Sequence, residues 1–212
     1  YEFSTNGVTV DLVAGTGSGG FATDDTFINI QNVKGSTSDD LFIANSVANS
    51  FVGNGGVDTV SYIKATDGNG VTVDLNAGVG TGGYADGDRY DGIRNATGTS
   101  YDDTFVANNL VNTFDGGLGS NTVSYAASNG GVTVDLITGI GTGAYAQDDK
   151  YIAIQNVIGS ASDDVFIAND VANRFDGGVS TAISHNRVSY AGDTADLTID
   201  LLNAGVAGIG GK

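Results

Sequence analysis

The feature that most constrains the fold of this chain is a long internal repeat. The hexapeptide GVTVDL begins at Gly7, Gly70 and Gly131, and an altered copy runs from Asp196 to Leu201. Its second residue recurs at intervals of 63, 61 and 65 residues. Repeats of this kind are typical of elongated arrays in which each unit packs on its neighbours. We therefore expect a single solenoid over residues 1–212, with repeats at residues 7–69, 70–130 and 131–195 and a partial fourth at residues 196–212.

Each long repeat also contains a finer period of nine residues. In the first repeat, GSTSDDLFI begins at Gly35, ANSVANSFV follows, and GNGGVDTVS begins at Gly53. Each unit has a turn rich in small or polar residues followed by a short alternating strand, and its eighth residue is large and apolar: Phe42, Phe51 or Val60. This alternation favours strands over helices. We expect little or no helix.

Strands every nine residues leave no room for crossover helices, so the chain should coil. Two strands and two turns make a rung of 18 to 22 residues, or about three rungs per long repeat. The predicted fold is an all-β parallel β-roll or right-handed β-helix, with rungs about 4.8 Å apart. The absence of proline is compatible with central strands. Residues 18 positions apart, such as Phe42 and Val60, should then lie in register in the interior.

The nonapeptide from Gly53 to Ser61 resembles the glycine-rich repeat of the RTX, or haemolysin-type calcium-binding, family, whose consensus is G-G-x-G-x-D-x-U-x. The resemblance covers essentially the whole chain. It implies a parallel β-roll with calcium in the turns and a bacterial protein exported to the extracellular space or cell surface. The chain departs from the consensus in the middle units, where Val47, Leu110 and Val171 replace a glycine. Branched side chains resist positive φ, so those turns are not expected to bind calcium.

Aspartates near the other turns are the candidate calcium ligands. Asp40 and Asp58 are 18 residues apart, which places them on the same side of adjacent rungs. Carboxylates and turn carbonyls are the ligands that calcium prefers. The alternative is that these aspartates only cap turns by binding local backbone amides. The predicted ligands are Asp40, Asp58, the adjacent Asp39, and Asp25 one rung earlier, with Asp88 and Asp103 (beside Asn121) and Asp149 and Asp164 (beside Asn186) in the later copies.

Asparagines on the opposite side of the coil suggest a structural role. Three pairs recur at a spacing of 17 residues, and stacked amides can satisfy turn backbone groups without an ion. We expect an asparagine ladder made of Asn32 and Asn49, Asn95 and Asn112, and Asn156 and Asn173.

The net charge of −17 narrows the possible partners. A chain this acidic is not expected to bind nucleic acid, because phosphate binding requires a basic surface. No apolar run approaches the roughly 18 residues of a membrane span. Any export signal is expected to lie outside this stretch. Without cysteine there is neither a disulfide framework nor a thiolate nucleophile.

Catalysis is not expected within this chain. His185 is the one histidine, and the arginines that could act as bases occupy different repeat positions. We expect an extracellular structural or adhesive rod (an adhesin stalk, surface-layer or filament-forming segment) that is stabilised by calcium and able to associate end to end. The alternative is an accessory module of a secreted enzyme. A more remote alternative is ice binding, for which the outward Thr9, Thr72, Thr133 and Thr198 are too sparse.

Overall fold

A computed structural model describes residues 1–179 and 184–194 of the chain. Within these ranges it contains twenty short β-strands and three 3-10 segments, η1 (Gly20–Ala22), η2 (Gly83–Ala85) and η3 (Ala144–Ala146), and no α-helix. The predicted all-β class is therefore confirmed. No helix of the described part is long and apolar enough to cross a membrane. The predicted partial fourth repeat, residues 196–212, lies outside the described residues.

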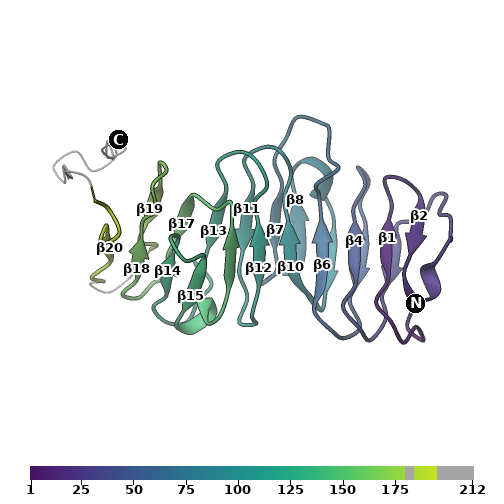
Figure 1. The fold of residues 1–212 in the computed structure, drawn as a ribbon, viewed down its shortest axis with the longest axis horizontal. Helices are drawn as coiled ribbons and strands as arrows, with labels where there is room; N and C mark the ends of the chain where they lie inside the picture. Colours follow the sequence, from purple (N-terminus) through teal and green to yellow (C-terminus); the bar gives the residue numbers. More distant parts are fainter. Residues whose placement is uncertain (180–183, 195–212) are drawn as a thin grey trace.

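The strands form two sheets that run along the length of the molecule (Figure 1). The eleven-stranded sheet contains β1 (Thr9–Asp11), β2 (Thr16–Ser18), β4 (Leu41–Ile43), β6 (Asp58–Ser61), β10 (Ile93–Thr97), β12 (Thr113–Asp115), β14 (Thr133–Asp135), β15 (Ile140–Thr142), β16 (Lys150–Ile152), β18 (Val165–Ile167) and β20 (Arg187–Ser189). The nine-stranded sheet contains β3 (Asn32–Lys34), β5 (Ser50–Val52), β7 (Thr72–Asp74), β8 (Val79–Thr81), β9 (Arg89–Asp91), β11 (Thr104–Val106), β13 (Thr122–Ser124), β17 (Asn156–Ile158) and β19 (Arg174–Asp176).

The nine-residue units alternate between the two sheets, so units two apart become parallel neighbours. Phe42 of β4 is opposite Val60 of β6, and Val33 of β3 is opposite Phe51 of β5. Both pairs are 18 residues apart, which confirms the predicted register. The reason is geometric, because a turn and a short strand use nine residues to cross the molecule once.

Each GVTVDL strand is followed by a strand that pairs with it antiparallel, which was not predicted from the sequence. In the second copy β7 pairs antiparallel with β8, and β8 pairs antiparallel with β9. Gly78 and Gly82 permit the reversal, because their φ values of 68° and 76° are ones that side chains rarely adopt. The copies therefore do not consist of three equal parallel rungs. The second and third copies are each a three-stranded meander followed by four strands that alternate between the sheets. In the first copy the third strand of the meander is reduced to an isolated bridge between Thr16 and Thr26.

This strand count makes successive copies begin on opposite sheets. The first strands of the copies are β1 in the eleven-stranded sheet, β7 in the nine-stranded sheet and β14 in the eleven-stranded sheet again. The two additional strands of each meander therefore fall on alternate sides. The sheets consequently keep similar lengths along the molecule, whereas meanders on one side would lengthen one sheet with every copy.

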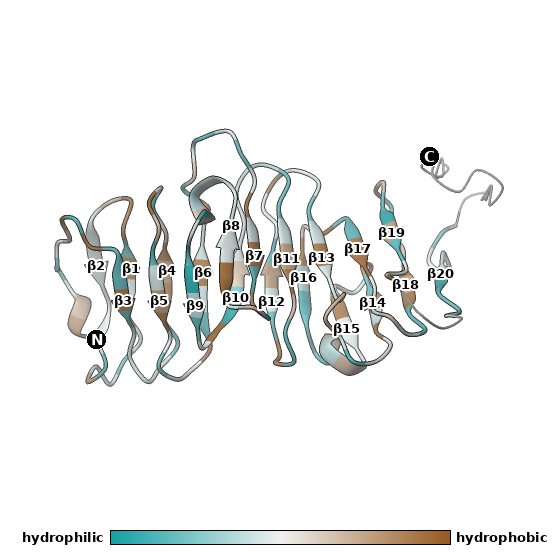
Figure 2. Cartoon of the chain, turned by 180° about the vertical axis from the view of Figure 1, so that it is seen from behind, coloured by the Kyte–Doolittle hydropathy of each residue, from teal (hydrophilic) through white to brown (hydrophobic). Residues whose placement is uncertain are grey.

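The core lies between the sheets and is filled by the eighth residues of the units, as predicted. Phe42 and Phe51 are both fully buried, and their ring centroids are 5.4 Å apart. Phe105 stacks on Phe114 in the second copy in the same way. Figure 2 shows apolar residues within the strands and more polar residues in many of the turns. Truncation of one such phenylalanine to alanine is expected to cost about 3–5 kcal/mol.

Candidate functional site

Asp40 and Asp58 are brought together at the starts of β4 and β6. The Asp40 N–H donates to Asp58 Oδ1 at 2.8 Å. The Asp40 carboxylate itself accepts from the backbone N–H groups of Val8 and Ser36, both at 2.7 Å, and from the Ser36 hydroxyl at 2.9 Å. Three consecutive strands of one sheet are thus linked at their starts by side-chain oxygens that accept backbone protons. This is the capping role that was the alternative to calcium.

The later copies repeat this arrangement, which we call the capping column: Asp40 with Asp58, Asp103 with Asn121, and Asp164 with Asn186. Asp103 accepts from the N–H of Val71 at 2.8 Å, and Asp164 accepts from that of Val132 at 2.8 Å. Their own N–H groups donate to the side-chain oxygens of Asn121 and Asn186, both at 2.9 Å. Each column therefore has an aspartate in its middle position, and only its last member varies between copies.

The turn of Asn121 shows which chemistry the last position favours. The Asn121 side-chain amide donates to the Ala153 carbonyl oxygen at 3.0 Å. Its nitrogen lies over Gly116, where an added methyl group would be 2.3 Å away. In the third copy Asn186 also donates from its amide, to the Gly177 carbonyl oxygen at 3.0 Å. The position holds a donor that faces backbone carbonyl groups.

Asp58 occupies the same position but carries no such donor when it is ionised. A methyl group added to Gly53 would be 2.1 Å from Asp58 Oδ2 and 2.9 Å from the Gly92 carbonyl oxygen. Gly92 occupies in the second copy the position that Ala153 occupies in the third. Oδ2 is buried and has no hydrogen-bond partner in the described part of the chain. Burial is the main cause that raises the Asp58 pKa to about 6, and the nearby Asp40 and Asp39 charges act in the same direction.

Asp88 and Asp149 lie in a second kind of site, away from the capping column. Asp88 accepts from the Asn49 N–H at 2.7 Å and from the Tyr62 hydroxyl at 2.5 Å, and that hydroxyl also contacts the Tyr90 hydroxyl at 2.5 Å. Asp149 has the same partners in the next copy: the Asn112 N–H at 2.7 Å and the Tyr125 hydroxyl at 2.7 Å, with Tyr151 beside them. Burial raises the pKa of Asp88 to about 6 and that of Asp149 to about 7.

The meander explains why these aspartates do not join Asp40 and Asp58. Asp25 accepts from the Tyr1 hydroxyl at 2.5 Å, and β2 and β1 lie between its segment and β4. In the second copy β8 and β7 separate β9, which follows Asp88, from β11, which follows Asp103. The expectation that Asp25 lies one rung before Asp40 in the same column was therefore wrong. The tyrosine partners were also missed, although the tyrosines recur in the same register as the repeat.

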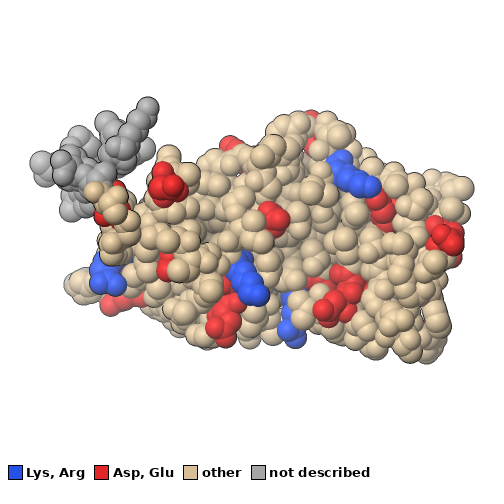
Figure 3. Space-filling view, viewed as in Figure 1, with Lys and Arg blue, Asp and Glu red and all other residues tan. Residues whose placement is uncertain are grey.

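Asp39 lies beside the column and is exposed. Its Oδ1 accepts from the N–H of Val57 at 2.8 Å. Asp102 and Asp163 accept in the same way in the later copies, from Ser120 and from His185. These aspartates bind the adjacent turn on the outside of the molecule, and they add surface charge there. Figure 3 shows such acidic groups spread along one face of the molecule.

The asparagines bind backbone groups of adjacent strands instead of stacking directly. Strand register is 18 residues, so Asn32 is opposite Ser50 and the pairs spaced by 17 are offset by one position. Asn95 and Asn156 accept from the N–H groups of Thr113 and Arg174, at 2.8 and 3.1 Å. Asn112 and Asn173 donate to the carbonyl oxygens of Arg94 and Gln155, at 2.8 and 2.9 Å. The Asn49 side-chain nitrogen is buried without a partner in the described residues.

The free oxygen of Asp58 determines where the calcium implied by the family resemblance could fit. Calcium takes about six to eight oxygen ligands. Both Asp40 carboxylate oxygens already accept backbone protons, whereas Asp58 Oδ2 lies free beside a carbonyl group. Among the residues that the structure describes, no group of three or more His, Cys, Asp or Glu side chains is arranged around a possible metal position. Among the buried predicted ligands, Asp58 Oδ2 is the oxygen without a hydrogen-bond partner, and the Gly92 carbonyl oxygen is the group beside it that could also contact a cation.

Comparison of the chain with protein-family models and with curated protein sequences gave no match.

Proposed function

We propose that this chain is a length of an extracellular structural rod, such as an adhesin stalk or a surface-layer or filament segment. We also propose that its two sheets wind as a parallel β-roll. The observation that carries the proposal is the junction between copies. β5 pairs with β9 and β6 with β10 where the first copy meets the second, and β12 pairs with β16 and β13 with β17 at the next junction. A junction that repeats in the same register can extend the rod by further copies.

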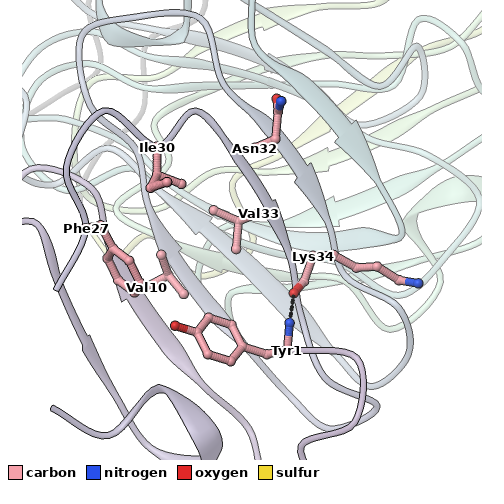
Figure 4. A pocket seen from close by; sticks show the side chains of 7 residues that line it. All are labelled: Tyr1, Val10, Phe27, Ile30, Asn32, Val33 and Lys34. Carbon is pink, nitrogen blue, oxygen red and sulfur yellow. Dashed lines mark hydrogen bonds between the residues drawn. The ribbon is translucent and has the colours of Figure 1, made fainter. Parts of the chain in front are cut away.

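The N-terminal end of the rod supports association with a second copy. A hollow of about 140 Å3 opens there (Figure 4), lined by Tyr1, Val10, Phe27, Ile30, Asn32, Val33 and Lys34. Inside the rod, the residues that correspond to Phe27 and Val33 are Tyr90 and Ala96, and these pair with Phe51 and Val60 of the preceding copy. The end therefore resembles a junction surface, and β19 and β20 of a second copy are the strands that we propose for it.

Tyr1 already occupies part of this junction. Its N-terminal amine donates to the Lys34 carbonyl oxygen at 2.6 Å. Inside the rod, the Tyr62 N–H donates in the same way to the Thr97 carbonyl oxygen at 2.9 Å. Tyr190 follows β20 as Tyr62 follows β6, so a docking copy must displace Tyr1. Particle length should increase with protein concentration in solution scattering, and Ile30→Lys, which places a charge on an exposed side chain that lines the hollow, should abolish the increase. Ile63→Lys, in an exposed loop within the rod, is the matched control. Particles of one length at every concentration would refute end-to-end association.

We further propose a stabilising calcium ion at Asp58. Ligands that bind the folded chain raise its melting temperature by mass action. Calcium should therefore raise the melting temperature relative to chelator, and Asp58→Asn should remove this gain because it replaces the free oxygen by a donor. Asp39→Asn is the control: Asp39 was among the ligands predicted from the sequence, but its carboxylate is exposed and accepts from Val57, so we do not propose it as a ligand. An equal gain in Asp58→Asn would refute this site.

A further inference from the structure

The boundary loop of the second copy departs from its two counterparts. Residues 62–71, between β6 and β7, form a loop two residues longer than residues 1–8 and 125–132. In the other copies a serine closes this loop: the Ser4 hydroxyl donates to the Asn6 carbonyl oxygen and the Ser128 hydroxyl to that of Gly130, both at 2.8 Å. In the second copy the residue at this position is Ala65, which has no hydroxyl. The loop is thus longer and lacks the serine hydrogen bond of the other copies; inside it, the Asn69 side-chain nitrogen donates to the Asp67 carbonyl oxygen at 3.3 Å.

A second departure lies next to this loop. The turn that begins at Gly98 carries Tyr101 where the first and third copies carry Ser38 and Ser162. The Tyr101 N–H donates to the Thr99 hydroxyl at 2.9 Å, which fixes the backbone of the turn. A change at one copy of a repeat is not required by the common fold. Function is more often carried by such local additions than by the scaffold itself.

The two departures face the same hollow. It has a volume of about 390 Å3 and is lined by Gly68, Asn69, Gly70, Ser100, Tyr101, Asp102 and Gly119. Its base is closely packed, because a methyl group added to Gly70 would be 1.8 Å from the Asp102 carbonyl oxygen, and one added to Gly119 would be 2.4 Å from that of Tyr101. The floor is therefore formed by backbone in contact with backbone, and side chains stand at its rim.

The side chains at the rim combine one aromatic ring with short polar groups. Tyr101 is half-buried, and Asn69, Ser100 and Asp102 are exposed. Asp102 Oδ1 accepts from the Ser120 N–H at 2.8 Å, which orients the carboxylate. The lining residues include no lysine or arginine, so the hollow does not favour phosphate, sulfate or uronic acid groups.

We propose that this hollow binds a neutral sugar unit. The aromatic face of Tyr101 suits the weakly positive C–H groups of a pyranose ring. The Asp102 carboxylate and the Ser100 hydroxyl can accept from sugar hydroxyl groups. The Asn69 side-chain oxygen can accept as well, whereas its nitrogen already donates to Asp67. The exposed backbone of Gly68 adds further polar groups. This inference does not depend on the structural role, because a monomeric or unassembled rod would keep the hollow.

Ligand-observed saturation-transfer NMR tests the proposal with the methyl glycosides of glucose, galactose, mannose and N-acetylglucosamine. At least one of them should give a signal with the full chain. Tyr101→Ser, which installs the residue of the other copies, should weaken the affinity about five- to tenfold, as expected for one aromatic contact. Ser162→Tyr is the matched control and should leave the signals unchanged, because the third copy has the shorter loop.

The melting temperatures of these variants separate a binding effect from a folding effect. Tyr101→Ser should melt as the natural chain does, because its counterparts already have serine there. Loss of the signal with an unchanged melting temperature supports the proposal. It is overturned if none of the four glycosides gives a signal with the natural chain, or if Tyr101→Ser binds as the natural chain does.

Discussion

Asp58 and Asn121 occupy the same place in two copies, and their side chains differ in one heavy atom. In the second copy the nitrogen of Asn121 donates to the Ala153 carbonyl oxygen. In the first copy the corresponding atom, Asp58 Oδ2, is a buried acceptor without a partner in the described ranges. The comparison shows that the repeat itself identifies a site at which one copy lacks a hydrogen bond that the others make. A proton or a cation can supply what is missing, since each would bridge the carboxylate and the carbonyl group.

The largest expected effect comes from the middle of the column, where both oxygens of Asp40 are used. Asp40→Asn should place an amide donor against the N–H of Ser36 or that of Val8, and so leave a buried donor unpaired. We expect a loss of about 2–3 kcal/mol in the free energy of unfolding. Urea unfolding at neutral pH measures it. A neutral effect would show that the column does not hold the strands together.

Replacing aspartate by asparagine at the last position of the capping column should change the free energy of unfolding in the opposite direction. Asp58→Asn supplies the donor that Asn121 already provides, so it should stabilise the chain in chelator by about 1–2 kcal/mol. Asn121→Asp is the reciprocal variant and should destabilise by a similar amount. Urea unfolding of the two variants measures both changes, and two changes of the same sign would contradict the comparison.

The dependence of stability on pH should show the same difference. The pKa of Asp58 is raised from 3.8 to about 6, so between these values the folded chain binds more protons than the unfolded chain. Its contribution to stability is therefore present below about pH 4 and is lost as the pH rises to about 6. In thermal melts in chelator, the melting temperature should decrease less between pH 4 and pH 7 in Asp58→Asn than in the natural chain. Asp88 and Asp149 also have raised pKa values, and they change stability with pH in the same direction in the variant and in the natural chain.

The smallest effect is expected beside the column, at the exposed Asp39. Asp39→Asn keeps the oxygen that accepts from Val57 and changes only a solvated charge. Its effect on the free energy of unfolding should stay within about 0.5 kcal/mol. A loss as large as that of Asp40→Asn would mean that the outer aspartates, and not the buried column, connect the turns.

The sequence predicted those parts of the fold that depend on local spacing. The nine-residue period placed Phe42 in register with Val60 in the interior, and this was confirmed. The meander was missed because its middle strands, β2, β8 and β15, have glycine at their centre and do not show apolar alternation. For the same reason Asp25 and Asp88 were predicted in the wrong place: their tyrosine partners are 24 and 26 residues earlier in the chain, spacings that no local pattern indicates.

The candidate site was predictable only in part for a different reason. The difference between Asp58 and Asn121 is visible in the sequence, and so is the pairing of Asp40 with Asp58. One oxygen of Asp58 accepts the Asp40 N–H and the other remains free. Which oxygen does which depends on the position of the Gly92 carbonyl group, which belongs to the next copy. This contact links residues 34 positions apart through the long loop, and a single sequence contains no signal for it.

The winding of the chain places residues 18 apart side by side in one sheet and residues nine apart on opposite sheets. The chain has no cysteine, so paired cysteines test this directly. Adjacent parallel strands bring paired α-carbons to about 4.8 Å, which a disulfide can bridge. Mild oxidation should form a disulfide in Lys34→Cys/Val52→Cys, which are opposite each other in β3 and β5. It should form none in Lys34→Cys/Thr59→Cys, which lie in different sheets. A disulfide in the second pair and none in the first would contradict the winding on which the capping column and the rod depend.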